Sequence, residues 1–550
     1  MNSKAAWLAA TVVSLVVMAA GYWMWQDHVV VFDDSYISYR YADNLVAGHG
    51  LVYNVGENVQ GYTNFLWTLI AAAAIRSGID PLSATRALGV ASHLFVLGAL
   101  SFFGFVLWFG RGGWLLALVL APMLGVLVVP EGFAAIAGSG LECSFVGMLV
   151  LAAGLILHRA KPSSAASDSV LVLLLTAACL TRLDCVLAVG AAGLATLVGA
   201  RMTGHSLRDA LLSAVKVVAP VAIVVALFIG WSYAVYGYIF PNTYYAKAAD
   251  LPHVREGFTY LVAFARCQPQ AVPLFLLTLV AALLPGDVQR RRVGIYAAVT
   301  LLAELAHIVR VGGDFMEYRF MWQVYGLLVL GGILGLLTVA DRSAAGALVL
   351  SWTMLSLSFQ PIALEKQYGM QSLQEMDGYA QLGESVGKRL GEVLPQPIVL
   401  ATTLAGTIAF YGKRTVIDQW GLNDRYVAHR PFKGFPLTRG HVKFAPLAYL
   451  RSRHVNLYIE HPVVCSCASP CRESKPNVFV RLGPGTDRCL RTWYLEETPR
   501  LTEYFCAHPE FFVLNRVYCS KPPRAAAAAA APAPSVAPAP SVAPAKAMAH

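Results

Sequence analysis

Apolar residues recur along this chain in runs long enough to cross a bilayer, and short polar loops separate the runs. A span needs about 20 apolar residues, because an α-helix rises only about 1.5 Å per residue. The pattern predicts eleven membrane-spanning helices, near residues 7–25, 84–108, 114–130, 143–158, 169–182, 185–200, 217–236, 270–286, 293–309, 322–340 and 343–359. A shorter run at 65–74 predicts a helix that lies along the membrane surface, because Arg76 follows it.

The first apolar run has two interpretations. Ala19, Ala20 and Gly21 resemble the cleavage site of a signal peptide. The aromatic residues that close the run, including Tyr22 and Trp25, are instead typical of a membrane interface. The run is also long, and we therefore expect a first helix that the protein retains.

The loops between the predicted helices carry unequal charge. Assigned alternately to the two sides of the membrane, they put these basic residues on one side: Lys4, Arg111, Arg159, Lys161, Arg201, Arg208, Lys216, Arg290, Arg291, Arg292 and Arg342. By the positive-inside rule this side is cytoplasmic. The polar loops with carboxylates, and everything after residue 360, fall on the other side. The sequence thus predicts a multi-pass protein of the plasma membrane with a cytoplasmic N-terminus and an extracytoplasmic C-terminal region.

Composition supports a membrane protein, since 57% of the 550 residues are hydrophobic and 13% are charged. The net charge of +10 does not require nucleic acid, because short basic loops explain it, and we expect no nucleic-acid partner. Three parts are expected. A transmembrane domain covers 1–359 with its first outer loop at 26–83, a soluble domain covers 360–523, and an Ala/Pro tail at 524–550 should be disordered.

The soluble region has the pattern of a mixed α/β domain. Apolar runs at 397–403, 455–459 and 477–482 predict strands, and the run at 408–411 fits either a strand or a helix. Six cysteines lie in this region: Cys465, Cys467, Cys471, Cys489, Cys506 and Cys519. An even number indicates disulfides in an oxidising compartment, with the pairing open. A zinc site at Cys465, Cys467 and Cys471 is the alternative.

The first outer loop contains adjacent aspartates, Asp33 and Asp34. Desolvating two carboxylates at the rim of a bilayer is costly, because water is what mainly stabilises their charge. Capping the helix predicted at 36–45 would need only one of them. The pair therefore indicates chemistry or cation binding.

Several motifs resemble integral-membrane glycosyltransferases of the GT-C superfamily, and among these the terminal arabinofuranosyltransferases. The motifs are Asp33-Asp34-Ser-Tyr-Ile-Ser-Tyr-Arg, Gly48-His49-Gly50, Ser139-Gly140-Leu141-Glu142, Arg182-Leu183-Asp184, Pro241-Asn242-Thr243-Tyr244-Tyr245-Ala246-Lys247, Gly312-Gly313-Asp314 with Arg319, and Gly440-His441-Val442-Lys443. The resemblance covers roughly residues 25–460. It implies a polyprenyl-phosphate sugar donor, used on the outer side of the membrane.

The resemblance implies roles for the polar residues. Asp33 or Asp34 would take the proton of the acceptor hydroxyl. Arg319, Lys247 and Arg182 would meet the donor phosphate, although each cation also fits a lipid-headgroup contact. Residues expected to position the substrate are Tyr36, Arg40, Glu142, Asn242, Tyr244, Asp314 and His441. No cofactor is implied with certainty, and a divalent cation, which Asp314 could help to bind, stays open.

The expected function is transfer of a sugar, arabinofuranose by the resemblance, from a polyprenyl-phosphate donor to a cell-envelope glycan. A protein acceptor such as a pilin is the alternative with the same chemistry. The alternative from another class is a lipid or solute transporter. Transporters usually place charges near the bilayer midplane and contain internal repeats, whereas the polar loops of this chain gather at one predicted face.

The loop charges generate a test of topology. A reporter fused after Phe359 should lie outside the cytoplasm, and the six C-terminal cysteines should resist alkylation until they are reduced. Reporter activity and thiol labelling of intact cells measure the two outcomes. A cytoplasmic reporter would reverse the predicted orientation.

Overall fold

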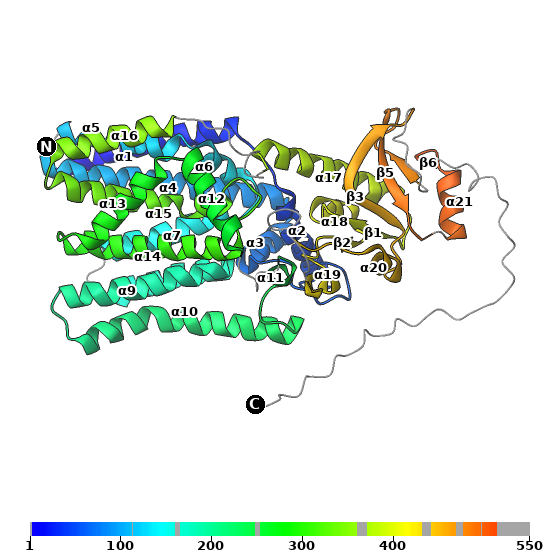
Figure 1. The fold of residues 1–550 in the computed structure, drawn as a ribbon, viewed down its shortest axis with the longest axis horizontal. Coiled ribbons are helices and arrows are strands. Elements are labelled where there is room, and N and C mark those ends of the chain that lie inside the picture. The colour runs from blue at the N-terminus through cyan, green and yellow to red at the C-terminus, as the bar shows by residue number, and fades with distance from the viewer. Residues whose placement is uncertain are drawn as a thin grey trace.

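The computed structural model describes residues 3–112, 114–159, 165–247, 253–359, 371–431, 442–468, 477–496 and 498–513. A long helical part and a smaller C-terminal part with a β-sheet lie end to end (Figure 1). The predicted fold class, a polytopic helical membrane protein with a C-terminal mixed α/β region, is confirmed. The predicted tail at 524–550 lies outside the described residues.

The helical part is built from helices joined mostly by short loops. Its elements are α1 (Ser3–Asp27), α2 (Asp33–Val46), α3 (Phe65–Arg76), α4 (Pro81–Gly112), α5 (Trp114–Val128), α6 (Glu131–Ala135), η1 (Ile136–Gly138), α7 (Cys143–Arg159), α8 (Ala165–Thr181), η2 (Leu183–Cys185), α9 (Val186–Met202), α10 (Leu207–Tyr236), α11 (Asn242–Ala246), α12 (Val254–Cys267), α13 (Ala271–Leu283), α14 (Val288–Val311), α15 (Arg319–Ala340) and α16 (Ala344–Ser358).

Six of the described helices are long and apolar enough to cross a membrane, or up to eight if each of two bent helix pairs is one span. Each predicted span overlaps a helix, but the predicted count of eleven is not confirmed. The shorter apolar helices, among them Cys143–His158, Ala166–Thr181 and Ala344–Ser358, have only 10–17 residues. Hydropathy marks these segments as buried or lipid-facing, but their length alone does not show that they span a bilayer.

Helix α15 is the centre of the helical part. It is buried along almost its whole length, because α7, α13 and α14 pack around it. Its apolar surface therefore faces other helices on all sides, as expected for a central helix. Helix α10, by contrast, exposes a row of large apolar side chains, including Leu211, Ile223 and Leu227, as expected for a helix that faces lipid.

The C-terminal part is a six-stranded mixed sheet with helices. Its elements are α17 (Leu373–Val393), β1 (Val399–Thr402), α18 (Thr407–Gly412), β2 (Thr415–Asp418), α19 (Arg425–His429), α20 (Leu447–Ser452), β3 (Leu457–Ser466), β4 (Asn477–Arg481), β5 (Arg488–Tyr494), α21 (Pro499–Ala507) and β6 (Phe511–Val513). The strand order is β2-β1-β3-β5-β4-β6, with β1 parallel to both neighbours and the remaining pairs antiparallel. The three predicted strands are present as β1, β3 and β4, and the ambiguous run at 408–411 is helix α18.

Disulfide chemistry in this region is confirmed. Cys467, just after β3, is bonded to Cys489 in β5. Cys465 and Cys506 are also in disulfides. A zinc site that used Cys465 and Cys467 as thiolates is therefore not formed.

The helical and C-terminal parts are joined by many polar contacts. The Asn242 side chain donates to the carbonyl oxygens of Gly421, Leu422 and Asp424 at 2.8–3.2 Å. Arg425 donates to backbone carbonyls of the helical part, and the Tyr53 hydroxyl donates to a backbone carbonyl of the C-terminal part. Buried amide and carbonyl groups need such partners, so the two parts fit in one arrangement. Figure 1 places α2, α3 and α11 at this junction.

Candidate functional site

A pocket of about 520 Å³ lies at the end of the helical part that meets the C-terminal part. Its wall is built from α2, the loop before α3, the turn between α8 and α9, the segment from α10 to Lys247, and the turn between α14 and α15. Leu422 and Val442 of the C-terminal part complete it. The polar loops that the sequence put on one side of the membrane thus come together at one cavity.

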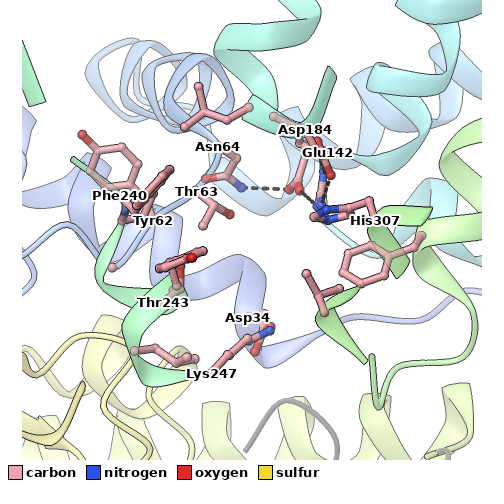
Figure 2. Close-up of a pocket in the computed structure, with 18 of the residues that line it drawn as sticks. Asp34, Tyr62, Thr63, Asn64, Glu142, Asp184, Phe240, Thr243, Lys247 and His307 are labelled. Atoms are coloured by element: carbon pink, nitrogen blue, oxygen red, sulfur yellow. Dashed lines mark hydrogen bonds and ion pairs between the residues drawn. The ribbon is translucent and has the colours of Figure 1, made fainter. Parts of the chain in front are cut away.

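One side of the pocket carries Asp34, Lys247 and Arg319, and Figure 2 shows Asp34 and Lys247 next to each other. Arg319 Nη1 lies 3.5 Å from Asp34 Oδ2, and its Nε pairs with Asp314. Burial alone would raise the pKa of Asp314, but Arg319 and Lys247 outweigh it and lower that pKa. Asp314 is thus a permanent anion that orients Arg319 from behind the pocket wall.

The turn between α14 and α15 holds this anion in place. Gly312 and Gly313 have φ angles of 90° and 77°, a backbone conformation that residues other than glycine rarely adopt. Helix α14 therefore ends at this pair. Asp314 follows and is 1% exposed. Its Oδ1 accepts from the backbone N–H of Phe315 at 2.7 Å, so the carboxylate has a fixed direction.

Lys247, which follows α11, is the least constrained cation of the pocket. Among the described residues no carboxylate lies within ion-pairing distance of its ammonium group, whereas Arg319 and Arg182 are both paired. Burial lowers the pKa of Lys247, and Asp314 restores part of it. A cation without a protein partner is available to an incoming anion.

The two adjacent aspartates have different surroundings. The Asp34 side chain is 26% exposed and lines the pocket, whereas Asp33 is 7% exposed and points toward the C-terminal part. Neither caps α2, whose N-cap residue is Phe32. Burial raises the pKa of Asp34, and Arg319 and Lys247 offset only part of this rise. Burial also raises the pKa of Asp33, so contacts rather than pKa distinguish the two.

The opposite side of the pocket is a hydrogen-bonded wall (Figure 2). Arg182 donates to Glu142 at 3.1 Å and to Asp184 at 2.7 Å. Glu142 accepts a further bond from Asn64 at 2.8 Å, and Asn64 accepts from Ser38 on α2 at 2.8 Å. One guanidinium faces two carboxylates in this wall, so it suits hydroxyl groups better than a second anion.

A third side of the pocket is apolar. It is lined by the side chains Val186, Leu187, Val225, Ile229, Ile239 and Phe240, which come from α9, α10 and the loop after α10. Ile239 and Phe240 are also among the exposed large apolar residues. The polar cavity therefore continues into a surface suited to hydrocarbon.

The predicted site residues differ in where they lie relative to the pocket. Asp34, Arg319, Lys247, Arg182, Glu142 and Tyr244 line the pocket. Asp314 stands behind Arg319, and Asp33 faces away. His441 lies outside the described residues.

Three predicted substrate-positioning residues are not part of the pocket lining: Tyr36, Arg40 and Asn242. Tyr36 packs among aromatic rings. Arg40 donates to the backbone carbonyls of Tyr53 and Arg414, and Asn242 holds the C-terminal part as described above. All three side chains thus contact other parts of the protein rather than the pocket. The motifs in which they occur do not show the direction of a side chain.

The sequence analysis assigned no site role to Asn64, Asp184 or His307, which also line the pocket. His307 lies inside the membrane-spanning helix α14, and an ionisable side chain there is a recognised signal of function. Asn64 and Asp184 lie in loops already assigned to the same side of the membrane. Among the described residues, no three His, Cys, Asp or Glu side chains are grouped as metal ligands.

Comparison with known proteins identifies the fold. A model of a domain of unknown function, DUF8728, matches residues 368–511. No curated protein matches the chain. A crystal structure of ArnT from Cupriavidus metallidurans bound to undecaprenyl phosphate is 13% identical, with a TM-score of 0.50, and the match covers 88% of this chain and 97% of that chain. The same protein in the apo state is 13% identical, with a TM-score of 0.46, and the match covers 88% and 98%. At this identity the likeness shows the fold alone, and the fold is similar to that of ArnT.

Proposed function

We propose that this protein is an integral-membrane glycosyltransferase that moves a sugar from a polyprenyl-phosphate donor to an acceptor hydroxyl. The observation that carries the proposal is the meeting of Asp34, Lys247 and Arg319 at one pocket that continues into an apolar surface. The GT-C fold supports it, because the ArnT structure with the same fold is bound to undecaprenyl phosphate. ArnT and this chain share too little sequence to carry over a substrate.

The chemistry follows from the charges. Asp34 accepts the proton of the acceptor hydroxyl as that oxygen bonds to the anomeric carbon of the donor. The bond between the anomeric carbon and the phosphate oxygen breaks, and the leaving polyprenyl phosphate gains one negative charge. Asp34 loses its negative charge in the same step, so Lys247 and Arg319 become available to the leaving group just when its charge grows.

The remaining walls suit the rest of the donor. The apolar residues of α9 and α10 would contact the prenyl chain. Glu142 and Asn64 would accept or donate hydrogen bonds to sugar hydroxyls. Arabinofuranose is the first sugar to test, and a cell-envelope glycan is the first acceptor, with a protein such as a pilin as the second. The site is proposed to face the extracytoplasmic side of the plasma membrane.

Stereochemistry is an additional test of the mechanism. A single displacement with Asp34 as base inverts the anomeric centre. A β-linked product from a β-phosphate donor would be net retention and would require a covalent carboxylate intermediate or a front-face route. Product analysis with a donor of defined anomeric configuration distinguishes these routes.

We expect Asp34→Asn to lower turnover by at least about a hundredfold, because it removes the general base while it preserves side-chain size. The assay measures sugar transfer and release of polyprenyl phosphate in membranes supplied with a panel of polyprenyl-phosphate sugars. Asp43→Asn is the matched control, because Asp43 lies on the same helix, is partly exposed and does not line the pocket. Normal turnover of Asp34→Asn at normal expression would contradict the proposal.

We expect Lys247→Met to weaken donor binding by about tenfold or more, because it removes a charge-assisted contact but keeps the apolar stem of the side chain. Arg319→Lys should impair transfer less than Arg319→Ala, since lysine keeps the charge beside Asp34 and Asp314 but loses the guanidinium fork. Donor affinity and turnover of purified variants measure both effects. If both Lys247→Met and Arg319→Ala kept an unchanged donor affinity, the donor phosphate would not bind at this wall.

The pH dependence of kcat/KM should be bell-shaped. Asp34 must be ionised, and its raised pKa puts the acidic limb above 3.8, the ordinary value for aspartate. Lys247 must be protonated, and its lowered pKa puts the alkaline limb below the ordinary 10.5. Lys247→Arg should therefore move the alkaline limb to higher pH and leave the acidic limb in place. An alkaline limb that does not move in Lys247→Arg would show that it belongs to another group.

A further inference from the structure

The carboxylate of Asp33 binds the N-terminal end of α18, in the C-terminal part. Its Oδ2 accepts from the Gly406 N–H at 2.8 Å, and its Oδ1 accepts from the Thr407 N–H at 2.8 Å and from the Thr407 hydroxyl. Helix α18 has no side-chain cap of its own. Asp33 supplies one from 373 residues earlier in the chain.

The same contact extends to the backbone. A Cβ atom added at Gly406 would lie 1.8 Å from the carbonyl oxygen of Asp33 and 2.7 Å from its carbonyl carbon. That carbonyl belongs to the peptide bond that joins Asp33 to Asp34. The start of α18 thus packs directly on the peptide unit that carries Asp34, and only glycine leaves room for this approach.

A second contact joins the other end of α2 to the other end of α18. Lys413, the C-cap residue of α18, pairs with Asp43 at 2.6 Å. Both side chains of this pair are partly exposed, 45% and 28%, so the pair contributes little to stability. The contact at Asp33 is buried and the contact at Asp43 is not, which provides a matched comparison on one pair of helices.

We infer that Asp33 is a positioning residue through which the C-terminal part holds Asp34 in its reactive orientation. The inference rests on the proposed function, in which Asp34 is the base. Asp33 fixes the first turn of α2, and the next side chain along the chain is then directed into the pocket, 3.5 Å from Arg319. The two aspartates have different roles, and the C-terminal part takes part in the active site through its hold on Asp33.

A double-mutant cycle between Asp33→Asn and Thr407→Val tests the inference. Each single variant should lower kcat by about tenfold, the equivalent of one buried hydrogen bond, with the donor KM nearly unchanged. The double variant should lose clearly less than a hundredfold, because both changes remove the bond between the Asp33 carboxylate and the Thr407 hydroxyl. The acidic limb of the pH profile should persist in all three variants, since Asp34 is intact.

Asp43→Asn should retain full activity and controls for loss of a contact between α2 and α18. Thr407→Ser keeps the hydroxyl donor and should also be active. Losses that multiply in the double variant, or loss of the acidic limb in Asp33→Asn, would overturn the inference, because Asp33 would then act on the substrate itself.

Two further measurements distinguish a failure of the inference from a folding defect and from a failure of the proposed function. If Asp33→Asn does not fold, Thr407→Val alone decides, since unchanged kcat overturns the inference and a lowered kcat with unchanged donor KM supports it. Asp34→Asn is assayed in parallel. Full activity of that variant contradicts the proposed base, whereas an inactive Asp34→Asn with independent effects at Asp33 and Thr407 contradicts only the positioning role.

Discussion

The placement of Arg319 between Asp34 and Asp314 is the interaction on which the pocket depends. Charged groups at the edge of a bilayer are stable only when opposite charges and hydrogen bonds replace the lost water. Asp314, held by backbone N–H groups, pairs with Arg319, and the charges of Arg319 and Lys247 both act on Asp34. The four groups are neutral as a set, so the pocket can exist empty. Protonation of Asp34 removes one negative charge and leaves the set positive.

The C-terminal part has a structural share in this arrangement. It contributes Leu422 and Val442 to the pocket wall, and its backbone carbonyls accept hydrogen bonds from the Asn242 side chain of the helical part. Hydrogen bonds between backbone groups and side chains such as Asn242 are directional, so the two parts meet in a fixed register. The site is therefore an interface between them rather than a feature of the helices alone.

Hydropathy and loop charge predicted much of this structure, because both depend on local composition. Each predicted span overlaps a helix, and the loops assigned to one side do meet at one pocket. The number of spans could not be predicted from hydropathy, since short apolar helices have the same composition as long ones. The different environments of Asp33 and Asp34 could not be predicted either, because the partners of Asp33 lie 373 and 374 residues away in the sequence. A motif shows which polar residues occur together, but not which of them faces a cavity.

The distance in sequence between Asp33 and Thr407 has a consequence for biosynthesis. The chain is made from its N-terminus, so α2 and Asp34 are in place long before α18 exists. Until the C-terminal part has folded on its side of the membrane, Asp33 lacks its partners and the pocket lacks Leu422 and Val442. The pocket is thus completed late in synthesis, and an incomplete chain would leave the proposed donor unused.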